Sequence, residues 1–458
     1  MILKSFLFLL ALVPFAKASS LTIYSGDHSL VKEKREIGSF VSKDEFLIDS
    51  ICSGAVAGSF RVLPAGKSGD PEIKSLRFIE AFANYNDIMD SFVGDTVKLL
   101  RYNEKNGTEI MKKALLIKSG PGPVFSIDGE VYLGAPGNVV LPSLPVNRGF
   151  LPGVLCSFDG KLKKKDSILI SYMTSGLGWK ADYSIYAEKK GRGIIESWVS
   201  IENRTGRPFN NTEVKIMAGE VNFDKGGPVR PVAGRNLFAR AESGIPRNDG
   251  AQQKPFSGFH IFSLPEPVDL LPGSPVRVRL FPNMNLSMER VTESVGGPCG
   301  FSGREKEEWV LQDIFNYLEF SNDKKSGVGK PLPSGTVRVY RRNGQEYEFA
   351  GEDNIENIPV DEKVKVRLGK AFDLKVKRKQ SLFERKGRNV SIYGCKFSVV
   401  NSGGKKESIR VMERMSGEWD ILENSLSYNK LNSGMIAFDL NLKPEEEKEF
   451  FYKVRVER

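Results

Sequence analysis

The segment Ile194-Ile-Glu-Ser-Trp-Val-Ser-Ile-Glu202 is typical of an extended strand with one apolar face and one polar face. Similar stretches lie before and after it, at Ile168–Thr174, Asp182–Glu188 and Glu213–Val221. Because an apolar strand face has to be buried against another layer, these segments predict a β-sandwich in the middle of the chain.

Turn-forming residues recur between such stretches along the sequence, which has 45 glycines and 24 prolines among its 458 residues. This pattern is typical of antiparallel sheets joined by tight turns. We therefore predict a mainly β protein built of several antiparallel β domains. Closely spaced strands between Val97 and Leu133, with turn signals at Asn106-Gly107 and Asp128-Gly129, would suit a small five-stranded β-barrel.

Two further segments have local signals for a helix or a strand. A short helix is expected at Asp87–Phe92, with Asn86 as its N-terminal cap and Gly94 as its stop. Trp309–Phe320 fits a helix or a strand, and we favour a strand for its second half, followed by a turn at Asn322.

The sequence predicts a signal peptide followed by three domains. These are 1–18 as the signal peptide, 19–148 as an N-terminal β domain with the small barrel, 149–330 as a central β-sandwich, and 331–458 as a C-terminal immunoglobulin-like β-sandwich. Prolines between Pro136 and Pro152, and the polar, glycine-rich passage Ser321–Pro333, mark the boundaries. Lys225–Lys254 has few periodic apolar positions and predicts a long flexible loop.

The first residues predict export from the cytoplasm. Lys4 precedes the apolar run Phe6–Phe15, and Ala16-Lys17-Ala18 places small residues where signal peptidase reads them. A run of about ten apolar residues is too short to anchor a chain across a bilayer, which takes roughly twenty. We expect a periplasmic or secreted protein that starts near Ser19 and has no transmembrane segment in its mature chain.

The formal net charge of +10 limits the classes of partner. The general consequence of this charge is solubility. The more specific consequence is attraction to anionic envelope polymers or lipid headgroups. Basic runs lie at Lys161–Lys165 and Lys375–Lys379. Because the chain has no base-stacking motif and is expected to be exported, nucleic acid is a poor candidate.

The four cysteines are Cys52, Cys156, Cys299 and Cys395. They lie far apart and form no C-x-x-C pair, so zinc and redox motifs are absent. Export would permit a disulfide, and both one structural disulfide and buried free thiols stay open.

No catalytic, cofactor-binding or metal site is predicted. The two histidines, His28 and His260, have no second histidine or carboxylate at metal-ligand spacing, and the sequence has no G-x-S-x-G elbow. Glu352-Asp353 is expected in a solvated turn, with calcium or substrate binding as a minor alternative. A carboxylate pair for glycoside hydrolysis stays open, because it requires only a spatial separation. The candidates are Asp182, Glu196, Glu220, Glu352 and Asp353.

Several blocks in order along the chain carry a family resemblance. Ser175-Gly-Leu-Gly-Trp-Lys-Ala-Asp-Tyr183, followed by Trp198–Asn203 and Ala218–Asn222, resembles the signature of the secreted bacterial family called domain of unknown function 4139. The later blocks are Phe259–Phe262, Pro331–Tyr340, Gly351–Asp353, Gly369–Asp373 and Gly417–Asp420. The resemblance implies an exported multi-domain β protein of unassigned biochemistry. The larger mucoidy inhibitor relatives carry a coiled-coil insertion, for which this sequence has no heptad run.

We interpret the family-motif residues as scaffold. Trp179 and Tyr183 would cover a sheet end, with a ligand-stacking platform as the alternative. Gly335 and Gly369 are expected at turns, and His260 is expected to be a hydrogen-bonded structural histidine. The full set is Gly178, Trp179, Tyr183, Trp198, Asn203, Gly219, His260, Gly335, Gly369 and Trp419.

Together these features predict a non-enzymatic exported envelope protein. Its β modules would bind or scaffold an envelope protein or glycan through sheet edges and the loop at 225–254. One alternative is a hydrolase that acts on cell-envelope polysaccharide through a carboxylate pair. Another is a polyanion-binding module driven by the basic runs, whose binding would weaken with salt. The sequence predicts neither the partner's identity nor the oligomeric state.

Overall fold

The structure is a computed structural model of the chain. It describes residues 18–37, 39–64, 72–82, 84–103, 108–143, 149–160, 162–163, 166–219, 221–223, 252–256, 259–297, 308–415 and 417–457. Two compact units are present, Met1–Trp179 with Val199–Val278 and Lys180–Trp198 with Arg279–Arg458, and each is described by itself.

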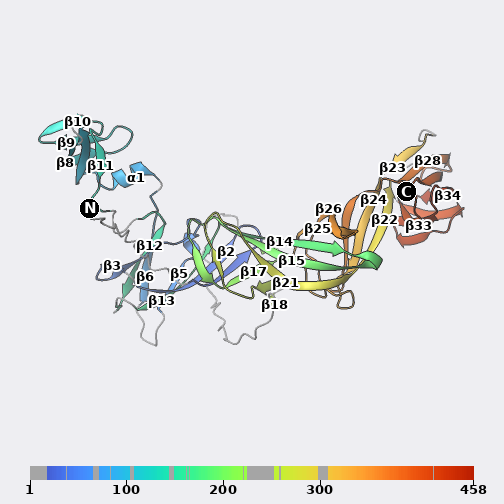
Figure 1. The fold of residues 1–458 in the computed structure, drawn as a ribbon, viewed down its shortest axis with the longest axis horizontal. Helices are drawn as coiled ribbons and strands as arrows, with labels where there is room; N and C mark the ends of the chain where they lie inside the picture. The colour runs from blue at the N-terminus through green and yellow to red at the C-terminus, as the bar shows by residue number, and fades with distance from the viewer. Residues whose placement is uncertain are drawn as a thin grey trace. The chain divides into compact units, whose positions relative to one another are not determined.

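The first unit consists of β-sheets and a short helix, α1 (Tyr85–Asp90) (Figure 1). A seven-stranded sheet has the order β18 (Gln252–Phe256), β19 (Phe259–Ser263), β17 (Val214–Ala218), β1 (Ala18–Tyr24), β2 (Ser29–Glu36), β13 (Ser167–Thr174), β5 (Arg61–Pro64). A four-stranded sheet has the order β3 (Ser39–Ser42), β4 (Glu45–Ile48), β12 (Gly153–Asp159), β6 (Glu72–Ile79). A five-stranded sheet, called the small sheet below, has the order β10 (Glu130–Leu133), β9 (Val124–Ile127), β8 (Thr108–Lys118), β7 (Thr96–Asn103), β11 (Asn138–Val140). A two-stranded pair joins β16 (Phe209–Thr212) to β20 (Val268–Leu270), and η1 (Ala57–Ser59) is a 3₁₀ turn.

The second unit contains most of a five-stranded sheet and two further sheets. The first has the order β21 (Val276–Ser287), β15 (Arg192–Asn203), β14 (Leu177–Ala187), β25 (Gly335–Asn343), β26 (Glu346–Ile355), and the 3₁₀ turn η2 (Lys189–Gly191) precedes β15. A six-stranded sheet has the order β27 (Lys363–Lys370), β24 (Ile314–Ser321), β22 (Glu289–Gly296), β30 (Glu407–Arg414), β33 (Met435–Leu442), β32 (Asn429–Asn432). The last has the order β23 (Val310–Gln312), β28 (Leu374–Arg385), β29 (Val390–Asn401), β34 (Glu447–Glu457), β31 (Glu418–Asn424).

The predicted fold class, a mainly β protein with several antiparallel sheets, is confirmed. Most neighbouring strands pair antiparallel, but β1 with β17, β14 with β25, and β22 with β30 pair in parallel. In the described part of the chain no pairing joins β10 to β11. Closure of the small sheet into a barrel therefore stays a prediction.

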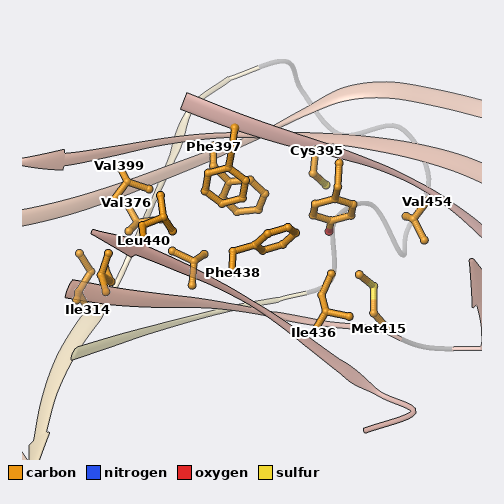
Figure 2. Close-up of a cluster of buried hydrophobic side chains, with 14 of the residues drawn as sticks. Ile314, Val376, Cys395, Phe397, Val399, Met415, Ile436, Phe438, Leu440 and Val454 are labelled. Carbon is orange, nitrogen blue, oxygen red and sulfur yellow. The ribbon is translucent and has the colours of Figure 1, made fainter. Parts of the chain in front are cut away.

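The last two sheets of the second unit pack face to face around an apolar core (Figure 2). Phe397 of β29 stacks on Phe450 of β34 with ring centroids 4.6 Å apart, and Phe438 of the opposite sheet lies 4.8 Å from Phe450. Aromatic side chains each bury about 150–250 Å² in such cores. The interdigitated rings make this pair of sheets a β-sandwich.

Strands on both sides of the expected boundary at 330 share sheets. β22, β23 and β24 precede residue 331 and belong to the sandwich, whereas β25 and β26 follow it and join β14. The link is the parallel register from Ala181↔Gly335 to Ala187↔Arg341. Such long-range pairing leaves no mark in local periodicity, so the sequence boundary does not separate one sheet from the next.

The predicted helix forms as α1, but its start and its cap were wrong. The Asn84 side chain, with Asn84 in an extended conformation, accepts a hydrogen bond from the Asp87 backbone N–H at 3.1 Å. Asn84 therefore caps the helix and Asn86 lies inside it, because both asparagines suited the sequence rule and only the backbone selects one. The turn after the helix reaches Gly94, whose φ is +91°.

The strand in Trp309–Phe320 can be compared with the structure, whereas most of the predicted loop and of the signal peptide cannot. The strand expected in the second half of Trp309–Phe320 is confirmed as β24, with Ile314, Leu318 and Phe320 buried. The loop expected at Lys225–Lys254 lies outside the described residues, except that its last three residues belong to β18. Most of the expected signal peptide also lies outside them, and Ala18 is the first residue of β1.

Candidate functional site

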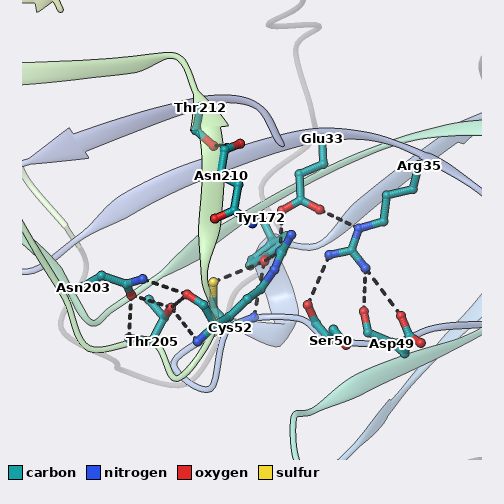
Figure 3. A network of polar contacts seen from close by, with 11 residues as sticks. Glu33, Arg35, Asp49, Ser50, Cys52, Tyr172, Asn203, Thr205, Asn210 and Thr212 are labelled. Atoms are coloured by element: carbon teal, nitrogen blue, oxygen red, sulfur yellow. Dashed lines mark hydrogen bonds and ion pairs between the residues drawn. The ribbon is translucent and has the colours of Figure 1, made fainter. Parts of the chain in front are cut away.

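The first unit buries a charged group of side chains that we call the Glu33 cluster (Figure 3). Its members are Glu33, Arg35, Cys52, Tyr172 and Arg207. Glu33 and Arg35 stand two residues apart on β2, so both point to the same, buried face of that strand. The Glu33 carboxylate accepts a hydrogen bond from Arg35 Nε at 2.5 Å and another from an Arg207 guanidinium N–H.

Arg35 also fixes the loop that follows β4. Its two terminal nitrogens donate to the carbonyl oxygens of Asp49, at 2.5 Å, and Ser50, at 3.2 Å. Ser50 has φ +51°, a left-handed conformation that costs energy for a residue other than glycine. The arginine thus compensates for a strained turn as well as for the buried carboxylate.

Tyr172 and Cys52 complete the Glu33 cluster. The Tyr172 hydroxyl donates to Cys52 Sγ at 3.3 Å and accepts from an Arg207 N–H at 3.3 Å. Burial raises the pKa of the Cys52 thiol, against smaller opposing effects of Tyr172 and Arg207. Because the thiolate is the reactive form of cysteine, this thiol is suited to packing rather than to nucleophilic chemistry.

Arg207 stays charged in this position. Burial acts to lower its pKa, but the negative charge of Glu33 and the hydrogen bond to it more than offset burial, and the pKa is raised. The Glu33 cluster is thus one carboxylate between two guanidinium groups. Such a group is held together by mutual compensation, and it is costly to break from one side.

Asn203, one of the predicted motif residues, fixes the turn that positions Arg207 in the Glu33 cluster. Its Nδ2 donates to the carbonyls of Arg207, at 2.7 Å, and Leu270, at 2.8 Å. Its Oδ1 accepts from Thr205 N at 3.0 Å and from Thr205 Oγ1 at 2.8 Å. The Asn203 side chain thus makes all four hydrogen bonds that a side-chain amide can make, which explains why asparagine occupies this position.

The second unit has its own buried carboxylate, Glu413, within the sandwich. Its oxygens lie 3.4 Å from an Arg378 nitrogen and accept hydrogen bonds from Gln312 Nε2 at 3.3 Å and the Tyr452 hydroxyl at 3.1 Å. Burial raises the pKa of Glu413 to about 7, although its polar neighbours act to lower it. A Cβ at Gly296 would lie 2.1 Å from Glu413 Oε1, so glycine makes room for this carboxylate.

The tyrosine and two of the tryptophans among the motif residues have scaffold contacts. Tyr183 is fully buried and its hydroxyl donates to the Pro333 carbonyl at 2.8 Å, which ties β14 to the segment before β25. Burial raises the Tyr183 pKa well above its ordinary value. The Trp419 indole donates to the Ser433 carbonyl at 2.6 Å, and the Arg279 guanidinium lies 5.0 Å from the Trp198 ring.

The indole Nε1 of Trp179 is buried and has no hydrogen-bond partner in the described part of the chain. His260 is half-buried on β19 with its ring 6.4 Å from that of Phe262. His28 packs its ring edge-on at 4.1 Å from Phe223. These contacts place both histidines in aromatic packing.

Two motif glycines lie within strands rather than at the turns we expected. Gly335 opens β25, and a Cβ there would lie 2.2 Å from the Ala181 carbonyl, so close approach of β14 requires glycine. Gly369, with φ +151°, lies in β27 where its register with β24 shifts, so a β-bulge explains it. Gly219 has φ +117°, and a Cβ there would meet the Phe259 ring at 2.8 Å. Gly178 has open space around its Cα.

Three of the candidate carboxylates, those of Asp182, Glu196 and Glu352, have polar partners within the described residues. Asp182 and Glu352 bind the same guanidinium, that of Arg338, at 3.1 and 3.2 Å. Glu196 accepts from Asn283 at 3.1 Å, and Glu220 lies outside the described residues. The solvated turn expected at Glu352-Asp353 is wrong: both residues lie in β26, and Asp353 accepts from Arg367 N at 2.8 Å. Within the described residues, no group of three or more histidine, cysteine or acidic side chains could hold a metal ion.

The sequence left open whether the cysteines form a disulfide or stay as buried free thiols, and the structure has both forms. Cys52 and Cys156 are buried free thiols, and Cys395 is disulfide-bonded. Burial raises the pKa of Cys156 to about 12.

The small sheet has two very different faces. One packs Val97, Leu99, Ala114, Leu116 and Phe125 with α1 into a core of its own. The opposite face, which we call the outer face, remains largely open to solvent although it is mostly apolar. Its apolar members include Leu100, Tyr102, Met111, Leu115, Val131 and Leu133, placed together by the registers of β7 with β8, β8 with β9 and β9 with β10.

Exposure of the outer face is large for such side chains. Leu133 is 87% exposed, Tyr102 66%, Val131 64% and Met111 54%. Lys98 and Lys113 lie opposite each other on the same face, and neither has an ion-pair partner in the described ranges. We did not predict this face, because β8 is apolar on both sides and only the fold reveals which side is covered.

No family model matches the chain, and no curated protein matches it. The resemblance to domain of unknown function 4139 therefore stays a prediction. In the described part of the chain, no helix has the length and apolar character needed to span a membrane.

Proposed function

We propose that this protein is a non-enzymatic exported binding protein of the cell envelope, which holds a protein partner on the outer face of the small sheet. The observation that carries the proposal is the exposure of Leu133, Tyr102, Val131 and Met111 on one sheet whose other face packs a core of its own. Contiguous apolar patches on the surface of soluble proteins mark interaction sites far more often than isolated apolar side chains do.

The charges on the outer face indicate the chemistry of the partner. Lys98 and Lys113 stand among the apolar side chains, with Glu109 opposite Tyr102 as the acidic group on this face. A partner with an apolar surface that carries carboxylates would bury the patch and neutralise both lysines. A second copy of this chain would bring lysines toward lysines, so we favour a different, acidic protein.

Three further parts of the proposal concern export, the β-sandwich and the family. The apolar run after Lys4 supports export, and the disulfide at Cys395 fits it because disulfides persist in oxidising compartments. The two facing sheets of the sandwich support an immunoglobulin-like module. The ordered sequence blocks support membership of domain of unknown function 4139.

A pull-down with crosslinking from the protein's own cell envelope tests the proposal, with both proteins and glycans identified. The variant combines Val131→Ser and Leu133→Ser, and the control is Phe372→Ser, because Phe372 is 95% exposed and lies in the second unit. We expect wild type and control to recover one stoichiometric protein, and the double variant to recover at least tenfold less. Loss of two anchoring side chains at a protein interface lowers the affinity by about this factor.

Equal recovery by all three proteins would contradict the proposal. Recovery of glycan without protein, of lipid vesicles, or only of further copies of this chain would also contradict it, since each outcome names a different occupant of the outer face.

A further inference from the structure

A second surface, in the second unit, carries a group of aromatic side chains that no core explains. It lies on β14, β25 and β26, where Tyr186 pairs with Tyr340 in parallel register and Tyr340 pairs with Phe349 in antiparallel register. Neighbouring positions such as Ile185 and Val339 are buried, so the aromatic residues point to the other side of the sheet. We call this side the aromatic face.

The rings form one continuous group across the three strands. Tyr186 and Tyr340 stack with centroids 5.3 Å apart and planes 16° from parallel. Tyr347 meets Tyr186 edge-on at 5.2 Å, and Phe349 meets Tyr340 edge-on at 5.9 Å. Phe349 is 58% exposed and Tyr347 37%, so the group presents open ring surface to solvent.

Polar pairs flank the rings in both directions along the strands. On one side, Glu188 accepts from Arg342 at 3.1 Å and from the Tyr347 hydroxyl. On the other side, Arg338 joins Asp182 to Glu352. Beyond that, Thr336 donates to Asn354 at 2.9 Å. The aromatic face is therefore a strip of rings bordered by fixed planar donors and acceptors.

The charge of the aromatic face selects among ligands. Asp182, Glu188 and Glu352 give three negative charges on this side, and Lys180, Arg338 and Arg342 give three positive charges, so the face is balanced (3 − 3 = 0) while the whole chain is at +10. A polyanion therefore gains no net attraction from the groups of this face, although the positive charge of the whole chain attracts it. Open rings beside paired carboxylates and guanidinium groups suit a neutral ligand with flat apolar faces and many hydroxyl groups.

We propose that the aromatic face binds a neutral oligosaccharide, with Phe349 and Tyr340 packed against the apolar faces of its sugar rings. The bordering pairs, Arg342 with Glu188 and Arg338 with Glu352, donate to and accept from the sugar hydroxyls. This site lies in the second unit and is independent of the protein partner proposed for the outer face of the small sheet.

The test measures binding of the full mature chain to neutral hexasaccharides by titration calorimetry. The probes are a β-1,4-glucan, an α-1,4-glucan and an N-acetylglucosamine oligomer, with heparin as the polyanion. Phe349→Ala removes an exposed ring of the aromatic face, and Phe372→Ala removes an exposed ring elsewhere in the same unit. We expect wild type and Phe372→Ala to bind at least one neutral probe equally, and Phe349→Ala to bind it at least tenfold more weakly.

A second variant separates binding from sheet stability. Arg342→Gln leaves the rings in place but removes the guanidinium that binds Glu188, and we expect it to weaken the same probe at least threefold without lowering the melting temperature by more than Phe372→Ala does. Absence of binding of every neutral probe by wild type would overturn the proposal. Equal binding by Phe349→Ala, or salt-sensitive binding of heparin alone at this face, would overturn it too.

Discussion

Replacing Glu33 by alanine is expected to lower the free energy of unfolding of the first unit by about 3–5 kcal/mol. The carboxylate lies between Arg35 and Arg207, and all three side chains are at least nine-tenths buried. Without Glu33, Arg207 loses its buried counter-charge, and Arg35 keeps only the exposed Asp49 carboxylate at 4.0 Å and the carbonyls of Asp49 and Ser50. Urea unfolding of the mature chain measures the loss.

The matched control is Glu36→Ala on the same strand. Glu36 is exposed and has no ion-pair partner in the described ranges, so its loss should change the free energy of unfolding by less than about 0.5 kcal/mol. Glu33→Gln, which keeps an acceptor but loses the charge, should lie between the two. If Glu33→Ala and Glu36→Ala had the same stability, the Glu33 cluster would not hold this unit together.

The stability of the second unit is expected to fall as the pH rises from 4.5 to 7. Burial raises the Glu413 pKa from 4.5 to about 7, so in this window the folded chain holds a proton that the unfolded chain has released. Folding therefore takes up a proton. The stabilisation that comes from this proton is complete below the unfolded pKa of 4.5 and is lost as the pH rises above the folded pKa of about 7. A shift of this size corresponds to roughly 3 kcal/mol across the window.

Urea unfolding at pH 5 and at pH 8 measures this dependence, with Glu413→Gln as the comparison. The glutamine keeps an acceptor for Tyr452 and cannot ionise, so the variant should lose the pH dependence and be more stable than wild type at pH 8. Wild type that is equally stable at both values, or a variant with an unchanged slope, would show that Arg378 keeps Glu413 ionised throughout.

Local features of the fold could be predicted from the sequence where neighbouring residues decide them. The alternation of Ile314, Leu318 and Phe320 is enough to predict β24, and the asparagines before Asp87 are enough to predict a helix start nearby. Which strands pair is decided by residues far apart, and the parallel pairing of β14 with β25 depends on contacts such as Ala181 with Gly335. A glycine required by that contact looks, in sequence, like a glycine required by a turn.

The same division holds for the candidate sites. Asn203 belongs to a recognisable sequence block, but its role became clear only with its hydrogen bond to the Arg207 carbonyl. The Glu33 cluster did leave a signal that we missed: Glu33 and Arg35 occupy inward positions of β2, where the alternation calls for apolar residues. Exposure of Leu133 left no signal, because nothing local distinguishes a covered apolar face from an open one.

The central claim is that the outer face of the small sheet holds a protein, and site-specific photo-crosslinking in the protein's own cell envelope tests it most directly. A photo-reactive amino acid is placed at Leu133, which is 87% exposed, or at Phe372, which is 95% exposed. We expect one discrete protein adduct from position 133 and none from position 372. No adduct at 133, or the same adducts at both positions, would contradict the account.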